Sequence, residues 1–366
     1  MFIYDYYANR KDQHLDLARH QYNAETARDF EEARFVHQSL PEMSVEDVDI
    51  STTVAGIEFP TPYYINAMTG GTEKTGEINQ TIGILSCLTK TPVASGSVSA
   101  AIKDPEVAKT FSVLRFENPK GIIFANLGAH HDVENAKRAV DLLEANALQI
   151  HLNAPQEIVM PEGDRDFSMW LSNIENIVRE IEVPVIVKEV GFGMSRETVE
   201  QLTSIGVQTV DVSGTGGTDF VKIESARRIL DSYDFLEGWG NSTVVSLVEV
   251  MNMPQELRPQ VLASGGVKNP LDIIKALSLG ADAVGLSNRF LQIFTSNRGL
   301  EPALSELNDF KTYTREIMTL LGARNVVELR QKDIILGANV QRWCEARGID
   351  WKQYANRSAK FKNVRQ

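Results

Sequence analysis

The 366-residue sequence predicts an α/β fold, and more specifically a closed (β/α)8 barrel. Short runs rich in Val, Ile, Leu and Ala recur along its middle, and stretches with helix start and stop signals lie between them. Nearly continuous apolar runs are typical of parallel strands that helices cover on both faces. A doubly wound open sheet is the alternative, because short strands are easily miscounted in a sequence.

The predicted strands alternate with helices from residue 62 to residue 287. They are PYYINA (62–67), PVASG (92–96), GIIFANL (121–127), LQIHLN (148–153), PVIVKEV (184–190), QTVDVS (208–213), QVLASG (260–265) and DAVGLS (282–287). A count of eight favours the closed barrel.

Two of the predicted helices carry clear terminal signals. In SRETVEQLTSIG, Ser195 is suited to cap the amino end and Gly206 to stop the helix. In NPLDIIKALSLG, Asn269 is the expected cap, Pro270 takes the first helical position and Gly280 ends the helix. These signals support the alternation of strands and helices.

The segments outside this alternation extend the barrel. Residues 20–38 are predicted to form a helix, and VDISTTVAGIEFP (48–60) a short hairpin before the first strand. The connection over 219–259 is longer than one helix needs, so we expect an insertion there. Since no internal repeat or low-complexity linker occurs, we expect one domain with three parts: an N-terminal arm and hairpin (1–60), the TIM barrel (61–290) and a C-terminal helical extension (291–366).

Composition narrows the functional class. The formal net charge is −12, which argues against a broad nucleic-acid footprint and against a basic membrane-binding face. No apolar run approaches the roughly 18–20 residues of a membrane span, and the first residues are charged where a secretory signal would be apolar. Cys87 and Cys344 stand far apart, which suits a reducing compartment. We therefore expect a cytoplasmic enzyme.

Polar residues or glycines stand at the carboxyl end of every predicted strand. In barrels of this type, catalysis takes place at that end. A purely structural sheet could have apolar ends, so we interpret the set as the rim of one site. In strand order it comprises Asn66–Gly71; Ser95, Ser97 and Ser99; Asn126; His151–Glu157; Lys188 and Glu189; Ser213–Thr218; Ser264–Gly266; and Ser287 and Asn288.

The fourth strand end, QIHLNAPQE (149–157), is the most densely polar. It contains His151, Asn153, Gln156 and Glu157 within seven residues. Glu157 is a hard oxygen ligand suited to Mg2+, which takes few protein carboxylates and keeps waters and substrate phosphates. A polar loop with a solvated acid is the simpler alternative.

Lys188 follows the apolar run VPVIV, so its ammonium should lie in a mostly apolar setting. A charge there is costly unless an anion compensates it. That anion is either a bound ligand or, alternatively, a neighbouring carboxylate in a structural ion pair.

Two glycine-rich strand ends, SGTGGT (213–218) and SGG (264–266), lack bulky side chains. Backbone N–H groups can therefore approach phosphate oxygens there. Glycines that only make turns are the alternative, although two such ends late in a barrel favour a phosphate site.

The N-terminal NRKDQH carries Arg10, Lys11 and His14. An Arg beside a Lys can neutralise a diphosphate, although a solvated helix start would look the same. His20, His130 and His131 have no ligand partners at useful spacing, and we interpret them as structural or surface residues.

Together these segments resemble the type 2 isopentenyl diphosphate isomerases, flavoprotein barrels distinct from the zinc- and magnesium-dependent type 1 enzymes. The resemblance is carried, in the family's order, by NRKDQH, AMTGGT, HLNAPQE, VKEVGFGMS, DVSGTGGT, WGNST, and ASGGV with NPLDIIKALSLGADAVG. It implies reversible conversion of isopentenyl diphosphate to dimethylallyl diphosphate in isoprenoid biosynthesis. It also implies reduced FMN, NADPH or NADH as its reductant, Mg2+, and a homo-oligomer that is a tetramer or larger.

The resemblance also implies roles for individual residues. Glu157 would hold Mg2+, and His151, Gln156 and Lys188 would be catalytic. The substrate would contact Arg10, Lys11, His14, Asn153 and Gln156. FMN would lie on Ala67, Met68, Thr69, Ser97, Asn126, Lys188, Ser213 and Thr218, with its phosphate near Gly265, Gly266, Leu286 and Ser287.

The isomerisation that the resemblance implies is compatible with the side chains at the strand ends. Moving a carbon–carbon double bond along an allylic unit adds a proton at one carbon and removes another nearby, without net redox change. No rim side chain is an obvious strong acid for an alkene, so a reduced flavin would supply the proton from its N5 region. Lys188 would favour the anionic reduced flavin.

Three other functions fit parts of the pattern. A 2-hydroxy-acid oxidase barrel needs a His base with arginines late in the barrel, a grouping absent from the sequence. A nucleotide dehydrogenase needs a nucleophilic Cys in a rim loop, whereas Cys87 falls in a predicted helix. A non-catalytic flavin- or phosphate-binding protein would not need both a cationic arm and a metal-binding acid.

Overall fold

Eight parallel strands close into a barrel in the computed structural model, which describes residues 10–22, 28–228, 232–296 and 299–362. Each predicted strand is present, so the closed (β/α)8 barrel is confirmed and the open sheet is wrong. The strands follow one another around the barrel in chain order: β4 (Tyr63–Ile65), β5 (Val93–Ala94), β6 (Ile123–Gly128), β7 (Ala147–His151), β8 (Val185–Lys188), β9 (Thr209–Asp211), β10 (Gln260–Ser264) and β11 (Ala283–Leu286).

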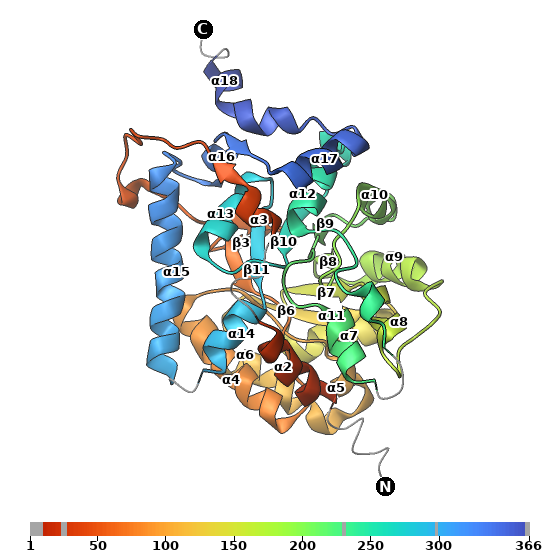
Figure 1. Ribbon diagram of the computed structural model, residues 1–366. Coiled ribbons are helices and arrows are strands. Elements are labelled where there is room, and N and C mark those ends of the chain that lie inside the picture. Colours follow the sequence, from red (N-terminus) through yellow and green to blue (C-terminus); the bar gives the residue numbers. More distant parts are fainter. Residues whose placement is uncertain (1–9, 23–27, 229–231, 297–298, 363–366) are drawn as a thin grey trace.

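Helices surround the barrel (Figure 1). Both predicted caps are confirmed: the Ser195 side chain accepts from the Thr198 amide, and that of Asn269 from the Asp272 amide. The outer apolar core lies between the strands and these helices. They are α4 (Glu73–Thr89), α6 (Lys109–Glu117), α7 (Val133–Leu143), α9 (Trp170–Glu180), α10 (Arg196–Ser204), α12 (Thr243–Met251), α13 (Pro270–Ser278) and α15 (Leu300–Leu320).

The predicted hairpin closes the amino-terminal end of the barrel. Strands β2 (Thr52–Val54) and β3 (Ile57–Phe59) pair antiparallel. Val54 and Phe59 pack into an apolar cluster with side chains from inside the barrel, including Phe124. Because this end is filled, only the carboxyl end is left for a ligand.

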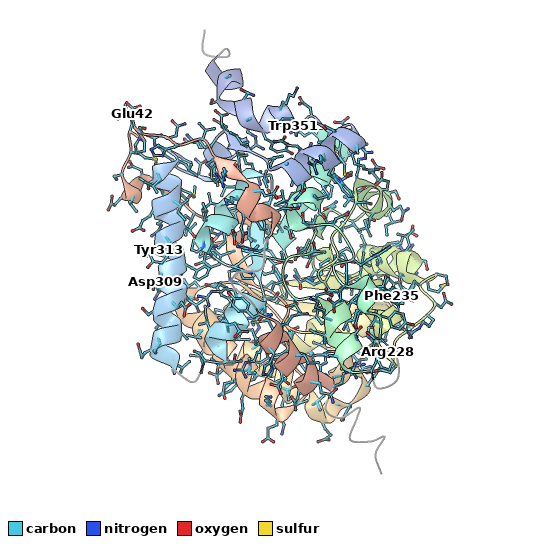
Figure 2. The ribbon with its side chains drawn as sticks, viewed as in Figure 1. Glu42, Arg228, Phe235, Asp309, Tyr313 and Trp351 are labelled. Atoms are coloured by element: carbon cyan, nitrogen blue, oxygen red, sulfur yellow. The ribbon has the colours of Figure 1, made fainter. Side chains whose placement is uncertain are left out.

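Additional short helices gather at that carboxyl end. The long connection over 219–259 contains α11 (Phe220–Ala226), the 3-10 helix η3 (Asp234–Leu236) with the exposed Phe235, and α12, so the predicted insertion is confirmed (Figure 2). Helices α5 (Ser99–Lys103), α8 (Ala154–Val159) and α14 (Asn288–Phe294) follow strands β5, β7 and β11. None of the described helices is long and apolar enough to cross a membrane.

The helix predicted over residues 20–38 is wrong. Helix α2 (Arg10–Gln21) ends where that helix should begin, α3 (Asp29–Glu32) is a single turn, and residues 23–27 lie outside the described part of the chain. The chain then becomes extended in β1 (Arg34–Phe35), which pairs antiparallel with β12 (Ile334–Ile335). A strand partner 300 residues away thus overrides the local helical pattern.

The C-terminal extension is mostly helical, as predicted, apart from β12. After α15 come α16 (Val326–Leu329), α17 (Ala338–Arg347), the 3-10 helix η5 (Trp351–Asn356) and α18 (Arg357–Lys362). Helix α17 is fixed to α12 through Glu249, whose side chain is fully buried. It accepts from the Trp343 indole at 2.7 Å and from Arg347 Nε at 2.8 Å.

We expect Arg347→Met to lower the free energy of unfolding by about 2 kcal/mol, because it leaves a buried carboxylate with one fewer charged donor. Burial raises the pKa of Glu249, but hydrogen bonds from Arg347 and Trp343 outweigh it and hold the pKa below its usual value. The stabilisation is therefore present above the unfolded-state pKa of the carboxyl and lost as pH falls through the folded one. Urea unfolding at pH 7 and at lower pH measures it. Arg342→Met, on the exposed side of the same helix, should change stability little; equal losses for both would contradict the assignment.

Candidate active site

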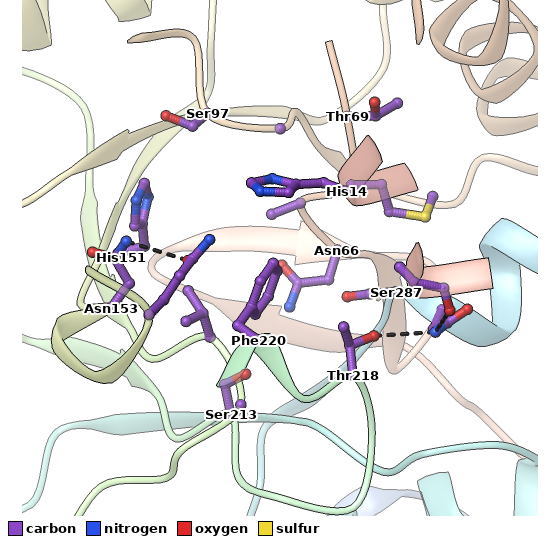
Figure 3. A pocket seen from close by; sticks show the side chains of 18 of the residues that line it. His14, Asn66, Thr69, Ser97, His151, Asn153, Ser213, Thr218, Phe220 and Ser287 are labelled. Carbon is purple, nitrogen blue, oxygen red and sulfur yellow. Dashed lines mark hydrogen bonds between the residues drawn. The ribbon is translucent and has the colours of Figure 1, made fainter. Parts of the chain in front are cut away.

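One cavity of about 350 Å3 opens at the carboxyl end of the barrel. Residues that follow all eight strands line it, as does the N-terminal helix α2. Figure 3 shows the side chains of His14 from α2, His151 from the end of β7, and Thr218 and Phe220 from the stretch that leads into α11 around this space. The volume lies in the range of small-molecule and cofactor sites.

All the predicted site residues line this cavity except Leu286. The side chain of Leu286 is buried in the apolar core outside the barrel, so a contact with the flavin phosphate would have to come from its backbone, and its assignment to that site stays a prediction. The reason is strand alternation: its neighbours Gly285 and Ser287 face the cavity, and Leu286 must face the other way.

The basic side chains of α2 lie at the cavity, and two of the three contact a carboxylate. The guanidinium of Arg10 is 3.6 Å from the Glu162 carboxylate, and His14 Nε2 is 3.0 Å from Glu224 Oε1. Lys11 has no ion-pair partner among the described residues. Its burial, and then the charge of Arg10, lower the pKa of Lys11 to about 8.

Glu224 on α11 is the main residue that sequence reasoning missed. Its carboxylate is fully buried and holds His14, accepts from Gln156 Nε2 at 2.8 Å, and pairs with Arg227. Burial raises the pKa of Glu224, but the hydrogen bonds from His14 and Gln156 and the charges of His14 and Arg227 outweigh burial, so the pKa lies below its usual value. This carboxylate therefore positions two side chains from distant segments.

Glu157 on α8 is buried and aimed at the cavity. Its Oε1 accepts from Asn153 Nδ2 at 2.8 Å, and its Oε2 from the Asp164 amide at 2.9 Å. The other polar atom of Asn153, Oδ1, is buried without a hydrogen-bond partner in the described structure. A carboxylate beside an unpaired amide oxygen fits a hard cation. No three His, Cys, Asp or Glu side chains among the described residues are grouped so that they could hold a metal ion, so such a cation would need ligands from substrate and water.

Lys188 ends β8 and is only 4% exposed. It donates to the backbone carbonyl of Glu189, and no carboxylate within the described chain pairs with it. The Glu189 carboxylate instead accepts from the amides of Val190 and Phe192 at 2.8 and 3.2 Å. Burial lowers the pKa of Lys188, against the opposing charges of Asp211 and Glu189. An anionic ligand would compensate this ammonium.

The two glycine-rich loops meet at the cavity. Gly265 has a φ of +89°, and a Cβ there would lie 2.0 Å from the carbonyl oxygen of Gly214. Gly216, Gly217 and Gly266 also line the cavity without side chains. Backbone N–H groups are therefore accessible, as a phosphate would require.

Of two adjacent histidines, one differs from the prediction and the other is structural as expected. His130, interpreted as structural or superficial, lines the cavity, whereas His131 Nε2 is hydrogen-bonded to Ser99 Oγ at 2.8 Å. Their position directly after the third strand end was the available signal. His20 is exposed and does not line the cavity, as expected for a surface residue.

Comparisons with known proteins agree with this arrangement. The chain matches the family model of FMN-dependent dehydrogenases over residues 116–336. It is 48% identical to an isopentenyl-diphosphate delta-isomerase of Streptomyces sp. (strain CL190), covering 96% of both chains. It is also 48% identical to an enzyme of the same name from Latilactobacillus sakei subsp. sakei (strain 23K), covering 93% of this chain and 97% of the relative.

Two solved structures illustrate the fold. A flavocytochrome b2 variant superimposes with a TM-score of 0.65 at 20% identity, covering 93% of this chain and 87% of that one. A mandelate oxidase variant with benzaldehyde superimposes with a TM-score of 0.57 at 16% identity, covering 91% and 94%. These two likenesses concern the fold alone.

Proposed function

The chain belongs to the isopentenyl-diphosphate delta-isomerase family, and from this premise we propose that it interconverts isopentenyl and dimethylallyl diphosphate with reduced FMN and Mg2+. One observation carries the proposal: a single cavity combines a cationic helix, glycine-rich loops, a buried unpaired lysine and a buried acid beside an unpaired amide oxygen. Each feature suits a different part of a flavin–diphosphate–metal assembly.

The donors around the cavity fit FMN. The buried ammonium of Lys188 suits the N1–C2=O edge of a flavin, and the glycine loops at Gly216–Gly217 and Gly265–Gly266 suit its phosphate. Ala67, Met68, Thr69, Ser97, Asn126, Ser213, Thr218 and Ser287 complete its proposed contacts. When bound, the reduced flavin supplies a proton source in its N5 region.

The opposite part of the cavity suits the substrate diphosphate. Arg10 and Lys11 neutralise its charge, and His14 is held in place by Glu224. Glu157, with Asn153 beside it, binds Mg2+, which neutralises the diphosphate further. The ring of Phe220, 6.3 Å from that of His14, offers an apolar surface for the hydrocarbon tail.

His151 and Gln156 are the side chains that handle protons or orient the alkene. Gln156 is fixed by Glu224, and His151 Nδ1 is hydrogen-bonded to Asn126 Oδ1 at 2.9 Å. Burial, and then the charge of Lys188, hold the pKa of His151 well below its usual value, so the imidazole is neutral. A neutral imidazole can accept a proton from the allylic unit.

Further properties belong to the same proposal. NADPH or NADH reduces the flavin, and the enzyme acts in the cytoplasm as a homo-oligomer of four or more chains. The described chain acts as one domain, because the hairpin and the C-terminal helices pack on the barrel and α2 contacts α4, α11 and α14.

An anaerobic assay tests the proposal. Purified protein is supplied with FMN, Mg2+ and isopentenyl diphosphate, with and without prior reduction of the flavin. We expect dimethylallyl diphosphate only with reduced FMN, and no net oxidation. Turnover of a 2-hydroxy acid in place of isomerisation would instead indicate an oxidase, and flavin binding without turnover a binding protein.

The low pKa of Lys11 predicts a pH dependence of substrate binding. As pH rises through about 8, Lys11 loses its charge in the free protein, so the affinity for a diphosphate falls. We expect KM to rise roughly tenfold from about pH 7 to about pH 9, with little change in kcat. Lys11→Arg keeps its charge and should flatten this profile. Identical profiles for the variant and the parent would exclude Lys11 as the cause.

A further inference from the structure

A chain of buried side-chain amides crosses the interior of the barrel at the floor of the cavity. It begins at Asp211 on β9 and ends at His151 on β7. Its links are Asn66 Nδ2 to Asp211 Oδ2 (3.2 Å), Gln149 Nε2 to Asn66 Oδ1 (3.3 Å), Asn126 Nδ2 to Gln149 Oε1 (3.2 Å), and Asn126 Oδ1 to His151 Nδ1 (2.9 Å).

Asp211 sets the donor-to-acceptor direction of the hydrogen bonds in this chain of amides. Its carboxylate is fully buried and accepts from the Tyr64 hydroxyl at 2.8 Å, from Ser264 Oγ at 2.9 Å and from the Ser213 amide at 3.2 Å. A carboxylate only accepts, so Asn66 must turn its nitrogen toward Asp211 and its oxygen the other way. Every following amide then has the same orientation, because reversing one would place two donors or two acceptors face to face.

A second path gives the same orientation. The Tyr64 hydroxyl donates its hydrogen to Asp211, so toward Gln149, which lowers the pKa of Tyr64, its oxygen can only accept, and the Gln149 nitrogen is the group that suits it. The packing leaves room for this arrangement at Gly285, where a Cβ would lie 2.8 Å from Asn66 Nδ2 and 2.9 Å from the Tyr64 oxygen. Two routes from one carboxylate therefore fix Gln149.

We infer that the carboxylate of Asp211, acting through this chain, fixes the tautomer of His151, with the proton on Nδ1 and the lone pair on Nε2 at the cavity. The last amide presents its oxygen to Nδ1, which must therefore be the protonated ring nitrogen. Asp211 does not line the cavity, so it is a positioning residue and His151 is the group that it prepares.

The surroundings of His151 keep the ring neutral, so that the tautomer matters. Besides burial, the charges that act most strongly on it are those of Lys188, His130, Lys11 and His131, and each of them lowers its pKa. A neutral ring has one acceptor nitrogen, and the chain assigns it to Nε2. The inference rests on the proposed function only in its consequence, which is that Nε2 serves as the proton acceptor toward the substrate.

Nitrogen NMR of histidine-labelled protein tests the inference without any turnover. The chain has six histidines, and the spectrum of a His151→Gln variant identifies the His151 signals by subtraction. In the parent protein at neutral pH we expect the Nδ1–H tautomer to exceed the Nε2–H tautomer by about tenfold or more. Asp211→Asn, whose amide can donate as well as accept, should give a mixture of the two tautomers.

Two further variants separate this effect from general damage. Ser264→Ala removes one donor from Asp211 but leaves the amide chain intact, so the tautomer should not change. Gln149→Met interrupts the chain without touching Asp211, and it should produce the mixture even if Asp211→Asn fails to fold. A proton on Nε2 in the parent, or an unchanged tautomer in the folded Asp211 and Gln149 variants, would overturn the inference. Absence of isomerase activity with the expected tautomers would instead count against the proposed function alone.

Discussion

Replacing Glu157 with Gln should lower the Mg2+-dependent rate of isomerisation by about a hundred- to a thousandfold, the cost of removing one key electrostatic contact in an active site. Gln has nearly the same shape but no charge, so it cannot hold a divalent cation as a carboxylate does. The two donors that face Glu157, Asn153 Nδ2 and the Asp164 amide, need two acceptors. Asn153 can turn its unpaired Oδ1 toward the new amide nitrogen, so the fold should survive.

The measurement is a Mg2+ titration of isomerase activity, together with the flavin absorbance of each preparation. FMN content should be unchanged, because Glu157 lies on α8 and not among the proposed flavin contacts. Asp166→Asn is the matched control, since it removes an exposed carboxylate from the loop that follows α8. Normal isomerisation by Glu157→Gln at low Mg2+ would exclude Glu157 as the metal ligand.

The barrel could be predicted because each of its strands has a recognisable local sequence pattern. Each is an apolar run with a polar or glycine end, and two of the intervening helices carry caps that the structure retains at Ser195 and Asn269. The polar strand ends then lie close together because the carboxyl ends of all parallel strands in a closed barrel lie at the same end of the barrel. Residues as distant as Met68 and Gly266 could therefore be placed in one cavity from strand topology, whereas only the family resemblance placed Lys11 there.

Interactions between distant segments could not be predicted in the same way. The contact of His14 with Glu224 joins residues 210 positions apart, and Glu224 belongs to no strand end. The pairing of β1 with β12 depends on a C-terminal segment that reads as helical in isolation. Leu286 is a different case: strand alternation places its side chain in the apolar core, which could be expected from the sequence, and its proposed contact with the flavin phosphate stays a prediction. Tertiary partners, and not local pattern, decide the first two cases.

A Lys188→Met variant should bind FMN about ten- to a hundredfold more weakly, because a charge-assisted hydrogen bond in a buried site is lost. The same substitution should leave the free energy of unfolding of the FMN-free protein unchanged or raise it by about 1 kcal/mol. The pKa of Lys188 is lower in the folded chain than its ordinary value, so the folded state carries a cost for the buried charge at neutral pH. That cost is present below the folded pKa and disappears as pH rises toward the unfolded one.

The opposite signs of these two effects make the Lys188 prediction specific. Lys275 on α13 offers a matched control, because it is also buried and also donates to a backbone carbonyl, that of Phe30, but lies outside the cavity. Lys275→Met should leave FMN affinity unchanged. Flavin fluorescence titration and turnover with pre-reduced FMN, set beside urea unfolding of the FMN-free proteins, measure both quantities. If Lys188→Met binds and turns over like the parent protein, the ammonium plays no part in the flavin site, and its burial needs another explanation.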